Sequence, residues 1–177
     1  MAEDGVAACP RHRAAGDRLD DDRVRPAQAA GVFTRNRVQG HSLQLTRQQI
    51  AGGLARAVVI NSGNANACVG DAGLSDAHAM AALVATGLGC PADQVLTGST
   101  GVIGQRLNID AVTFGIDLAF GQLSDSREAA RAAETASLTT DLRPKSCAVT
   151  CQVGGRQITI GGMAKGSGMI HPNMATM

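Results

Sequence analysis

The sequence predicts a mixed α/β fold in which helices cover β-sheets. Two observations support this prediction. Short apolar runs typical of strands, of which residues 55–61 are the clearest, alternate with at least three segments whose apolar residues recur at helical spacing. A Gly-Gly pair joins two further strand-like runs near the C-terminal end. No internal linker or repeat interrupts the pattern, so we expect one domain over residues 25–177, preceded by a leader over residues 1–24.

The leader has dense charge, few large apolar residues and no secretory signal. Its composition predicts a poorly ordered segment. Strands are then expected at residues 30–34 and near Val38. A period-two alternation predicts another strand at residues 42–46.

Residues 55–61 read as a short buried strand, and the small polar residues 62–66 after it have turn chemistry. This loop could equally contact a ligand, although a turn is the safer interpretation. A helix is expected from Ser75 or Asp76 to Leu88, closed by Gly89 and Pro91. His78 within it is expected to be a surface or packed residue.

Two more helices are predicted, over residues 110–120 and 126–134. The first places Ile109, Val112, Ile116 and Phe120 on one face. The second is rich in alanine and charge, and Ser124 or Ser126 could cap it. Residues 146–153 and 156–160 then form a β-hairpin around Gly154-Gly155.

Bulk composition excludes several classes of function. The formal net charge is +1 and the chain has no Trp or Tyr, which argues against nucleic-acid binding. No apolar run is long enough to span a bilayer. The odd number of scattered cysteines favours reduced thiols in a cytoplasmic protein, and no metal site is expected. The cysteines are Cys9, Cys68, Cys90, Cys147 and Cys151.

Three loops have residues suited to chemistry. Residues 98–104 place glycines around Ser99 and Thr100, and such a turn can aim backbone N–H groups at one spot or simply end a strand. The Thr-Thr-Asp run at residues 139–141 can bind a substrate or end a helix. Residues 161–177 surround Lys165 with glycines, and a lysine there can hold a carboxylate.

The last loop also contains Thr176, its most reactive candidate. A hydroxyl needs a base before it becomes a nucleophile, and an N-terminal threonine supplies that base as its own α-amine. The Ala175–Thr176 bond would have to break to expose this amine. Taken alone, a surface threonine in a glycine-rich loop is the more economical reading.

Four colinear segments, residues 30–38, 59–68, 99–104 and 161–177, closely resemble the bifunctional glutamate/ornithine N-acetyltransferases of arginine biosynthesis. The similarity extends from about Arg25 to the end of the chain. It implies a layered αββα sandwich whose first strands enter the main sheet. It further implies self-cleavage between Ala175 and Thr176, with a β-chain beginning at Thr176 that completes the fold in an α2β2 heterotetramer.

The resemblance implies acetyl transfer from N-acetylornithine to glutamate through an acetyl-Thr176 intermediate. Thr100 and Gly101 would form the oxyanion hole, and Thr139, Lys165 and Thr176 would bind substrate, with Thr140 an open alternative to Thr139. No cofactor is implied, although some members also accept acetyl-CoA as a co-substrate. At residues 140–142 the family usually has Thr-Asp-Thr, whereas this chain has Leu142 in place of the second threonine.

The chain would then be the α-chain portion of a self-cleaving precursor and is expected to be inactive alone. Three alternative functions are compatible with the sequence. The first two are an N-terminal-nucleophile amidohydrolase or peptidase and a secondary-metabolism acetyltransferase of the same fold. The third is a non-enzymatic ligand-binding subunit, for which the full Walker phosphate-binding pattern is absent.

Overall fold

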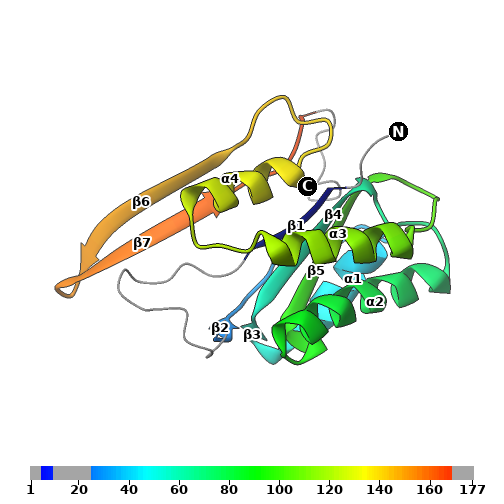
Figure 1. Ribbon diagram of the computed structural model, residues 1–177, viewed down its shortest axis with the longest axis horizontal. Coiled ribbons are helices and arrows are strands. Elements are labelled where there is room, and N and C mark those ends of the chain that lie inside the picture. The colour runs from blue at the N-terminus through cyan, green and yellow to red at the C-terminus, as the bar shows by residue number, and fades with distance from the viewer. Residues whose placement is uncertain (1–4, 10–24, 169–177) are drawn as a thin grey trace.

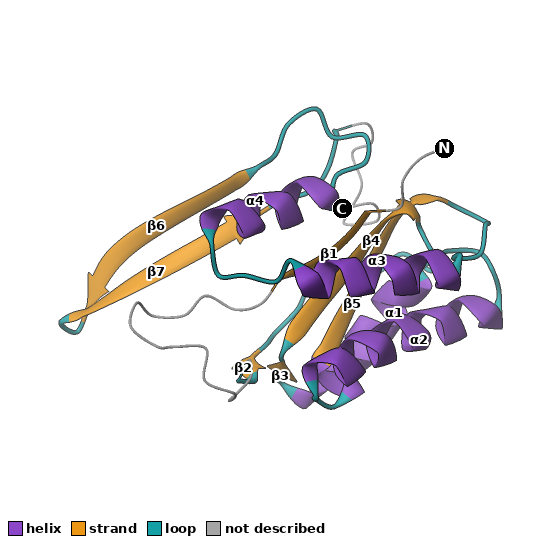
Figure 2. Cartoon of the chain, viewed as in Figure 1, coloured by secondary structure: helices purple, strands orange, loops and turns teal. Residues whose placement is uncertain are grey.

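The computed structural model describes residues 5–9 and 25–168 and has a mixed α/β fold (Figures 1 and 2). The prediction of the fold class is therefore confirmed. The elements, in chain order, are β1 (Gly5–Cys9), β2 (Ala27–Gln28), α1 (His41–Gln49), η1 (Ile50–Gly52), β3 (Leu54–Ala55), β4 (Ala57–Asn64), α2 (Asp71–Leu88), η2 (Ala92–Gln94), β5 (Val95–Val102), α3 (Ile109–Gly121), α4 (Arg127–Ala136), β6 (Ser146–Val153) and β7 (Arg156–Met163).

A three-stranded sheet of order β1-β4-β5 forms the centre of the molecule. Strand β4 pairs parallel with β5 and antiparallel with β1. Helix α2 makes the crossover between the two parallel strands, as their connection requires. Two further sheets, β2-β3 and β6-β7, each contain two strands.

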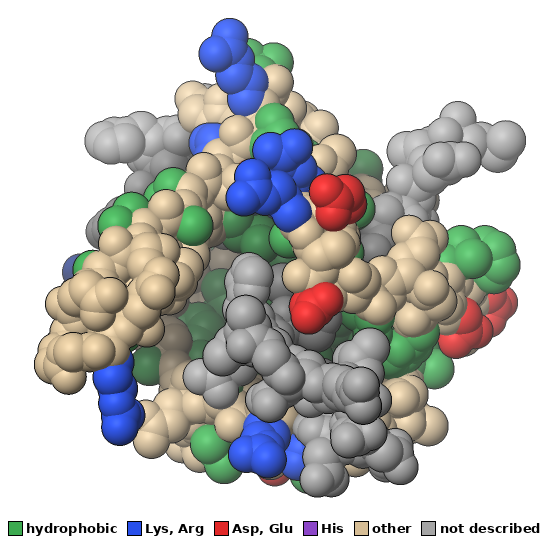
Figure 3. All heavy atoms as spheres, turned by 60° about the vertical axis from the view of Figure 1, so that its left-hand side comes forward, with side chains coloured by type: hydrophobic (Ala, Val, Ile, Leu, Met, Phe, Trp, Pro, Cys, Tyr) green, Lys and Arg blue, Asp and Glu red, His purple; other side chains and the backbone are tan. Residues whose placement is uncertain are grey.

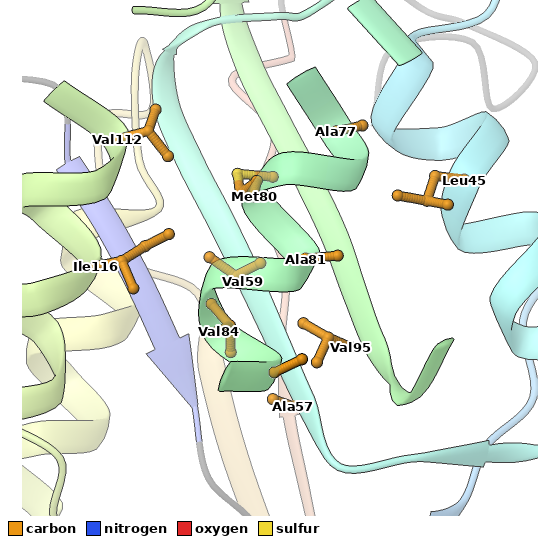
Figure 4. Close-up of a cluster of buried hydrophobic side chains, with 11 residues drawn as sticks. Leu45, Ala57, Val59, Ala77, Met80, Ala81, Val84, Val95, Val112 and Ile116 are labelled. Atoms are coloured by element: carbon orange, nitrogen blue, oxygen red, sulfur yellow. The ribbon is translucent and has the colours of Figure 1, made fainter. Parts of the chain in front are cut away.

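The hydrophobic core lies between the sheet and helices α1, α2 and α3 (Figure 4). Val59 and Val95 point from the sheet toward Met80, Leu45 and Val112 on the three helices, and all five are at most 2% exposed. Burying each such side chain contributes about 1.5–3 kcal/mol. Residues alternate between the faces of a strand, so residues 58 and 60 lie on the sheet's other face.

All three predicted helices are confirmed. Helix α2 begins a turn earlier than expected, at Asp71, and ends at Gly89 in a left-handed conformation (φ 60°). Helix α3 is capped by Asn108, whose side chain accepts from the Ala111 amide. The cap of α4 is Ser126, one of the two candidates.

The strand predicted at residues 42–46 is wrong, because these residues form helix α1. Ser42, Leu45 and Gln49 are buried at helical spacing on one side of the helix, and the two leucines alone produced the apparent alternation. The strand at residues 30–34 and the extended site at Val38 are also wrong. Both segments are irregular, and Val32 and Val38 are exposed.

The composition of residues 1–24 predicted poor order, and at Gly5–Cys9 this needs correction. The backbone there forms β1, an edge strand that pairs with residues 58–62 of β4. Helices α3 and α4 both contact this strand. A strand entering the main sheet is what the family resemblance implied.

The predicted hairpin is confirmed as β6 and β7, with Gly154 and Gly155 both at positive φ in the turn. It projects away from the central sheet (Figure 1). Cross-strand partners share a face, and pairs such as Val149 with Ile160 make one face apolar, yet every residue of both strands is exposed. Figure 3 shows hydrophobic side chains at the surface and basic side chains in several separate places.

Candidate active site

Thr100 and Gly101 lie at the end of β5, not in a turn after it, which corrects the expectation for residues 98–104. Strand β4 likewise continues through Asn64, past the start of the predicted turn at residues 62–66. Thr100 pairs in register with Ser62, and Gly101 pairs with Gly63. The Ser62 and Thr100 hydroxyls therefore lie on the same face of the sheet, opposite the helical layer.

Gly101 occupies a position where only glycine fits. Its φ is 144°, and a Cβ placed there would overlap the carbonyl group of Gly63 on the neighbouring strand. Gly63 is itself at positive φ (135°). The two backbones can approach this closely because Gly101 has no side chain.

An asparagine–serine network holds this end of the sheet. The Ser99 hydroxyl donates to the Asn64 carbonyl oxygen at 2.6 Å, and the Asn61 amide donates to Ser99 Oγ at 3.1 Å. The Asn64 side chain donates in turn to the carbonyl oxygens of Gln105 and Arg106. The network therefore fixes the loops that follow β4 and β5 against each other.

Sequence reasoning missed this network, because it read residues 62–66 as a turn. The signal that could have found it was the repeated asparagine. Asn61 and Asn66 are both at most 1% exposed, and the NH2 groups of buried amides are usually hydrogen-bonded. The Asn66 side chain donates to Gly73 in α2, and Asn66 has a left-handed backbone (φ 46°).

An ion pair ties the loop after β5 to helix α2. Arg106 contacts Asp76 through two nitrogens, at 2.6 and 3.1 Å, in a bidentate pair. The Asp76 side chain is 4% exposed, whereas the Arg106 side chain is 60% exposed. This geometry adds directional restraint to the loop that follows β5.

Lys165 and Thr139 come together around the carboxylate of Asp141. Lys165 Nζ donates to Thr139 Oγ1 at 2.7 Å and to Asp141 Oδ2 at 2.9 Å. Lys145 Nζ and the Gly166 amide both donate to the other carboxylate oxygen, Oδ1, at 2.9 and 2.6 Å. Four groups from two loops separated by the β6-β7 hairpin thus meet at one place.

Asp141 is the buried centre of this group, with a side chain only 1% exposed. The hydrogen bond from Lys145 lowers the pKa of its carboxyl well below the ordinary range, with further contributions from the Gly166 amide and from Lys165. Asp141 therefore remains a carboxylate throughout the neutral range.

The candidate residues thus form two groups. Thr100 and Gly101 form one, and Thr139 and Lys165 form the other. No hydrogen bond or ion pair between described residues joins the two groups. Ala175 and Thr176, the predicted cleavage pair, lie outside the described residues.

The structure also shows which of the two threonines Lys165 contacts and where Leu142 lies. Lys165 contacts Thr139, not its neighbour Thr140. Leu142, which stands where the family usually has threonine, is 93% exposed.

Among the described residues, no three His, Cys, Asp or Glu side chains are grouped so as to bind a metal ion. None of the described helices is long and apolar enough to cross a membrane. Neither finding adds a function to the two groups above.

The sequence is similar to curated proteins with two different names. It is 50% identical over 152 residues to the arginine biosynthesis bifunctional protein ArgJ of Symbiobacterium thermophilum, covering 86% of this chain and 37% of the relative. It is 47% identical over 154 residues to a glutamate N-acetyltransferase of Methanothermobacter thermautotrophicus, covering 86% of this chain and 38% of the relative. The chain thus spans little more than a third of the length of these relatives.

Solved structures match the fold closely. The ArgJ protein of Bacillus halodurans superposes with a TM-score of 0.80 at 41% identity, covering 97% of this chain and 91% of that one. An ornithine acetyltransferase of Mycobacterium tuberculosis, solved with ornithine, has a TM-score of 0.75 at 38% identity, covering 87% and 79%. The ArgJ family profile matches residues 22–177. The chain therefore belongs to the ArgJ family.

Proposed function

We propose that this chain is the α-chain portion of an enzyme that transfers an acetyl group from N-acetylornithine to glutamate. The observation that carries the proposal is the contact between Lys165 and Thr139. These residues lie 26 positions apart, and the family resemblance assigns both to substrate binding. They meet at 2.7 Å, beside a carboxylate that fixes the lysine.

The proposed reaction proceeds in two steps through Thr176. The Thr176 α-amine, exposed by cleavage after Ala175, takes the hydroxyl proton while Oγ attacks the acetyl carbonyl carbon. The amide C–N bond then breaks, ornithine leaves with that proton on its amine, and the acetyl group stays on Thr176 as an ester. The glutamate amine attacks the ester, which releases N-acetylglutamate and restores the hydroxyl.

Thr100 and Gly101 would stabilise the oxyanion that forms in both steps. The Asn61–Ser99–Asn64 network and the Gly63–Gly101 contact hold this strand end rigidly. Donors that are fixed before the reaction stabilise developing charge without reorganising at that moment. No cofactor is required, and use of acetyl-CoA as a second acetyl donor is a further part of the proposal to test.

The lengths of the related chains support a two-chain enzyme. This chain covers 91% of the solved Bacillus halodurans chain but only 37% of the curated ArgJ relative from Symbiobacterium thermophilum. The solved chain is therefore less than half as long as that relative. Such a pair of lengths is expected if a precursor is divided near Thr176. We further propose that its second part is the β-chain of an α2β2 enzyme and that this enzyme is cytoplasmic.

Product analysis tests the proposal. The full-length protein is incubated with N-acetylornithine, with and without glutamate, and the products are separated. Formation of N-acetylglutamate that depends on glutamate is expected. Release of free acetate at the same rate whether or not glutamate is present would instead identify an amidohydrolase and overturn the proposed transfer.

A further inference from the structure

We propose that Asp141 is a positioning residue for substrate binding: it holds the Lys165 ammonium group against Thr139, where that group can bind the α-carboxylate of an amino-acid substrate. This inference rests on the proposed function and extends it to a residue that does not itself touch substrate. The observations that carry it are the burial of Asp141, its three donors and the position of those donors in the chain.

The first step concerns where the lysine is held. Lys165 follows β7, the second strand of a hairpin whose residues are all exposed. Hydrophobic packing of the hairpin therefore does not fix the position of Lys165. Its side chain is nevertheless only 20% exposed. The contacts to Asp141 and Thr139 are the interactions that restrain the ammonium group within the described part of the chain.

The second step concerns the backbone. The Gly166 amide donates to Asp141 Oδ1 at 2.6 Å, so the carboxylate restrains the residue after Lys165 as well as its side chain. Gly166 is at positive φ (153°), where residues with side chains are rarely found. Asp141 therefore restrains both the backbone at Gly166 and the side chain of Lys165.

The third step is the balance of charge. One carboxylate faces two ammonium groups, Lys145 and Lys165, which leaves one net positive charge at the site. An ammonium group has three protons, and two of those on Lys165 are donated to described residues. The remaining proton and the net charge suit a single carboxylate, such as the α-carboxylate that ornithine and glutamate both have.

Lys145 has a different part in this arrangement. Its side chain is 42% exposed, so water screens its charge more than that of Lys165. It contacts Oδ1, on the side of the carboxylate away from the Lys165 contact. Lys145 thus orients Asp141, and Asp141 orients Lys165.

The experiment uses the full-length protein and the variant Asp141→Asn, with Asp117→Asn as the matched control. Asp117 is exposed on α3, so the same chemical change there removes a charge without touching the site. We measure kcat, per molecule of cleaved enzyme, and KM for N-acetylornithine and for glutamate. Lys145→Met and Asp141→Glu complete the series.

For Asp141→Asn we expect KM for both substrates to rise about tenfold, the usual effect of losing a charged hydrogen bond, with kcat changed less than about threefold. Asp117→Asn should match the wild type. Lys145→Met should raise KM by a smaller factor, and Asp141→Glu should recover part of the loss. A fold defect would instead lower the active fraction, and hence kcat, without changing KM.

Unchanged KM values in Asp141→Asn would overturn the inference, as would a fall in kcat alone. Ornithine binding, measured by calorimetry, separates this inference from the proposed reaction. If the wild-type protein binds ornithine but transfers no acetyl group, the proposed function fails. An increase of about tenfold in the ornithine Kd of Asp141→Asn would still support the positioning role, and an unchanged Kd would refute it.

Discussion

The two halves of the candidate site are held by different forces. Thr100 and Gly101 belong to a strand whose other face packs on the hydrophobic core, and their neighbours are fixed by close backbone contact. Lys165 follows an exposed hairpin and is fixed by an ion pair and hydrogen bonds to Asp141. The first half therefore depends on shape, and the second depends on charge.

This difference suits what each half is proposed to do. Stabilisation of an oxyanion needs donors that do not move, which a packed strand provides. Binding a charged substrate needs a cation whose own charge is only partly neutralised, which a shared carboxylate provides. The two halves should consequently fail under different perturbations.

The largest effect is expected from Gly101→Ala, compared with Gly161→Ala. At Gly101 the new methyl group would overlap the Gly63 carbonyl at a positive φ, which we expect to destabilise the protein by about 2–4 kcal/mol. At Gly161, on β7, the methyl group meets open space, and the change should stay within about 0.5 kcal/mol. Urea unfolding of both full-length variants gives the two free energies.

Acetyl transfer should follow the same order, with Gly101→Ala losing most of its activity and Gly161→Ala retaining it. Equal stability in the two variants would contradict the view that close backbone contact holds Thr100 and Gly101 in place.

A smaller effect is expected from pH, and it should be confined to the charged half. The pKa of Asp141 is lower in the folded protein than the value of about 3.9 that is usual in an unfolded chain. Its ionised form therefore contributes stability that is complete above about pH 5 and decreases as the pH falls through about 4 toward the folded-state pKa.

Asp141→Asn lacks this contribution. The difference in unfolding free energy between wild type and Asp141→Asn should thus be largest near neutral pH and shrink on acidification, as urea titrations at several pH values would show. Asp117→Asn again serves as the control. If the difference in unfolding free energy stays constant down to about pH 3, the charge of the Asp141 carboxylate does not hold Lys165 and Gly166 in place.

The sequence predicted the parts of the fold that are governed by local patterns. Helix α2 has a long apolar periodicity and a glycine at its end, and the hairpin has a Gly-Gly turn, so both were found. Helix α1 was missed because its buried face contains Ser42 and Gln49, which carry no hydrophobic signal. The burial of polar residues there is decided by tertiary contacts, such as the bond from the Gln49 side chain to Ala92.

The site shows the same division. Family resemblance pointed to Thr139 and Lys165, but no spacing in the sequence indicated that they meet through Asp141. That contact depends on the β6-β7 hairpin, whose antiparallel strands bring Lys165 back beside residues 139–145. The role of Asn61 was hidden for a similar reason, because its partner Ser99 lies on the next parallel strand.

Intact-protein mass measurement tests the central claim most directly. The full-length protein is incubated with N-acetylornithine in the absence of glutamate, and a Thr176→Ala variant serves as the control. The account predicts that the wild type consists of two polypeptides, that the one beginning at Thr176 gains the mass of one acetyl group, and that adding glutamate removes it. An uncleaved wild-type chain that still exchanges acetyl groups, or a Thr176→Ala variant that is cleaved and acetylated, would contradict it.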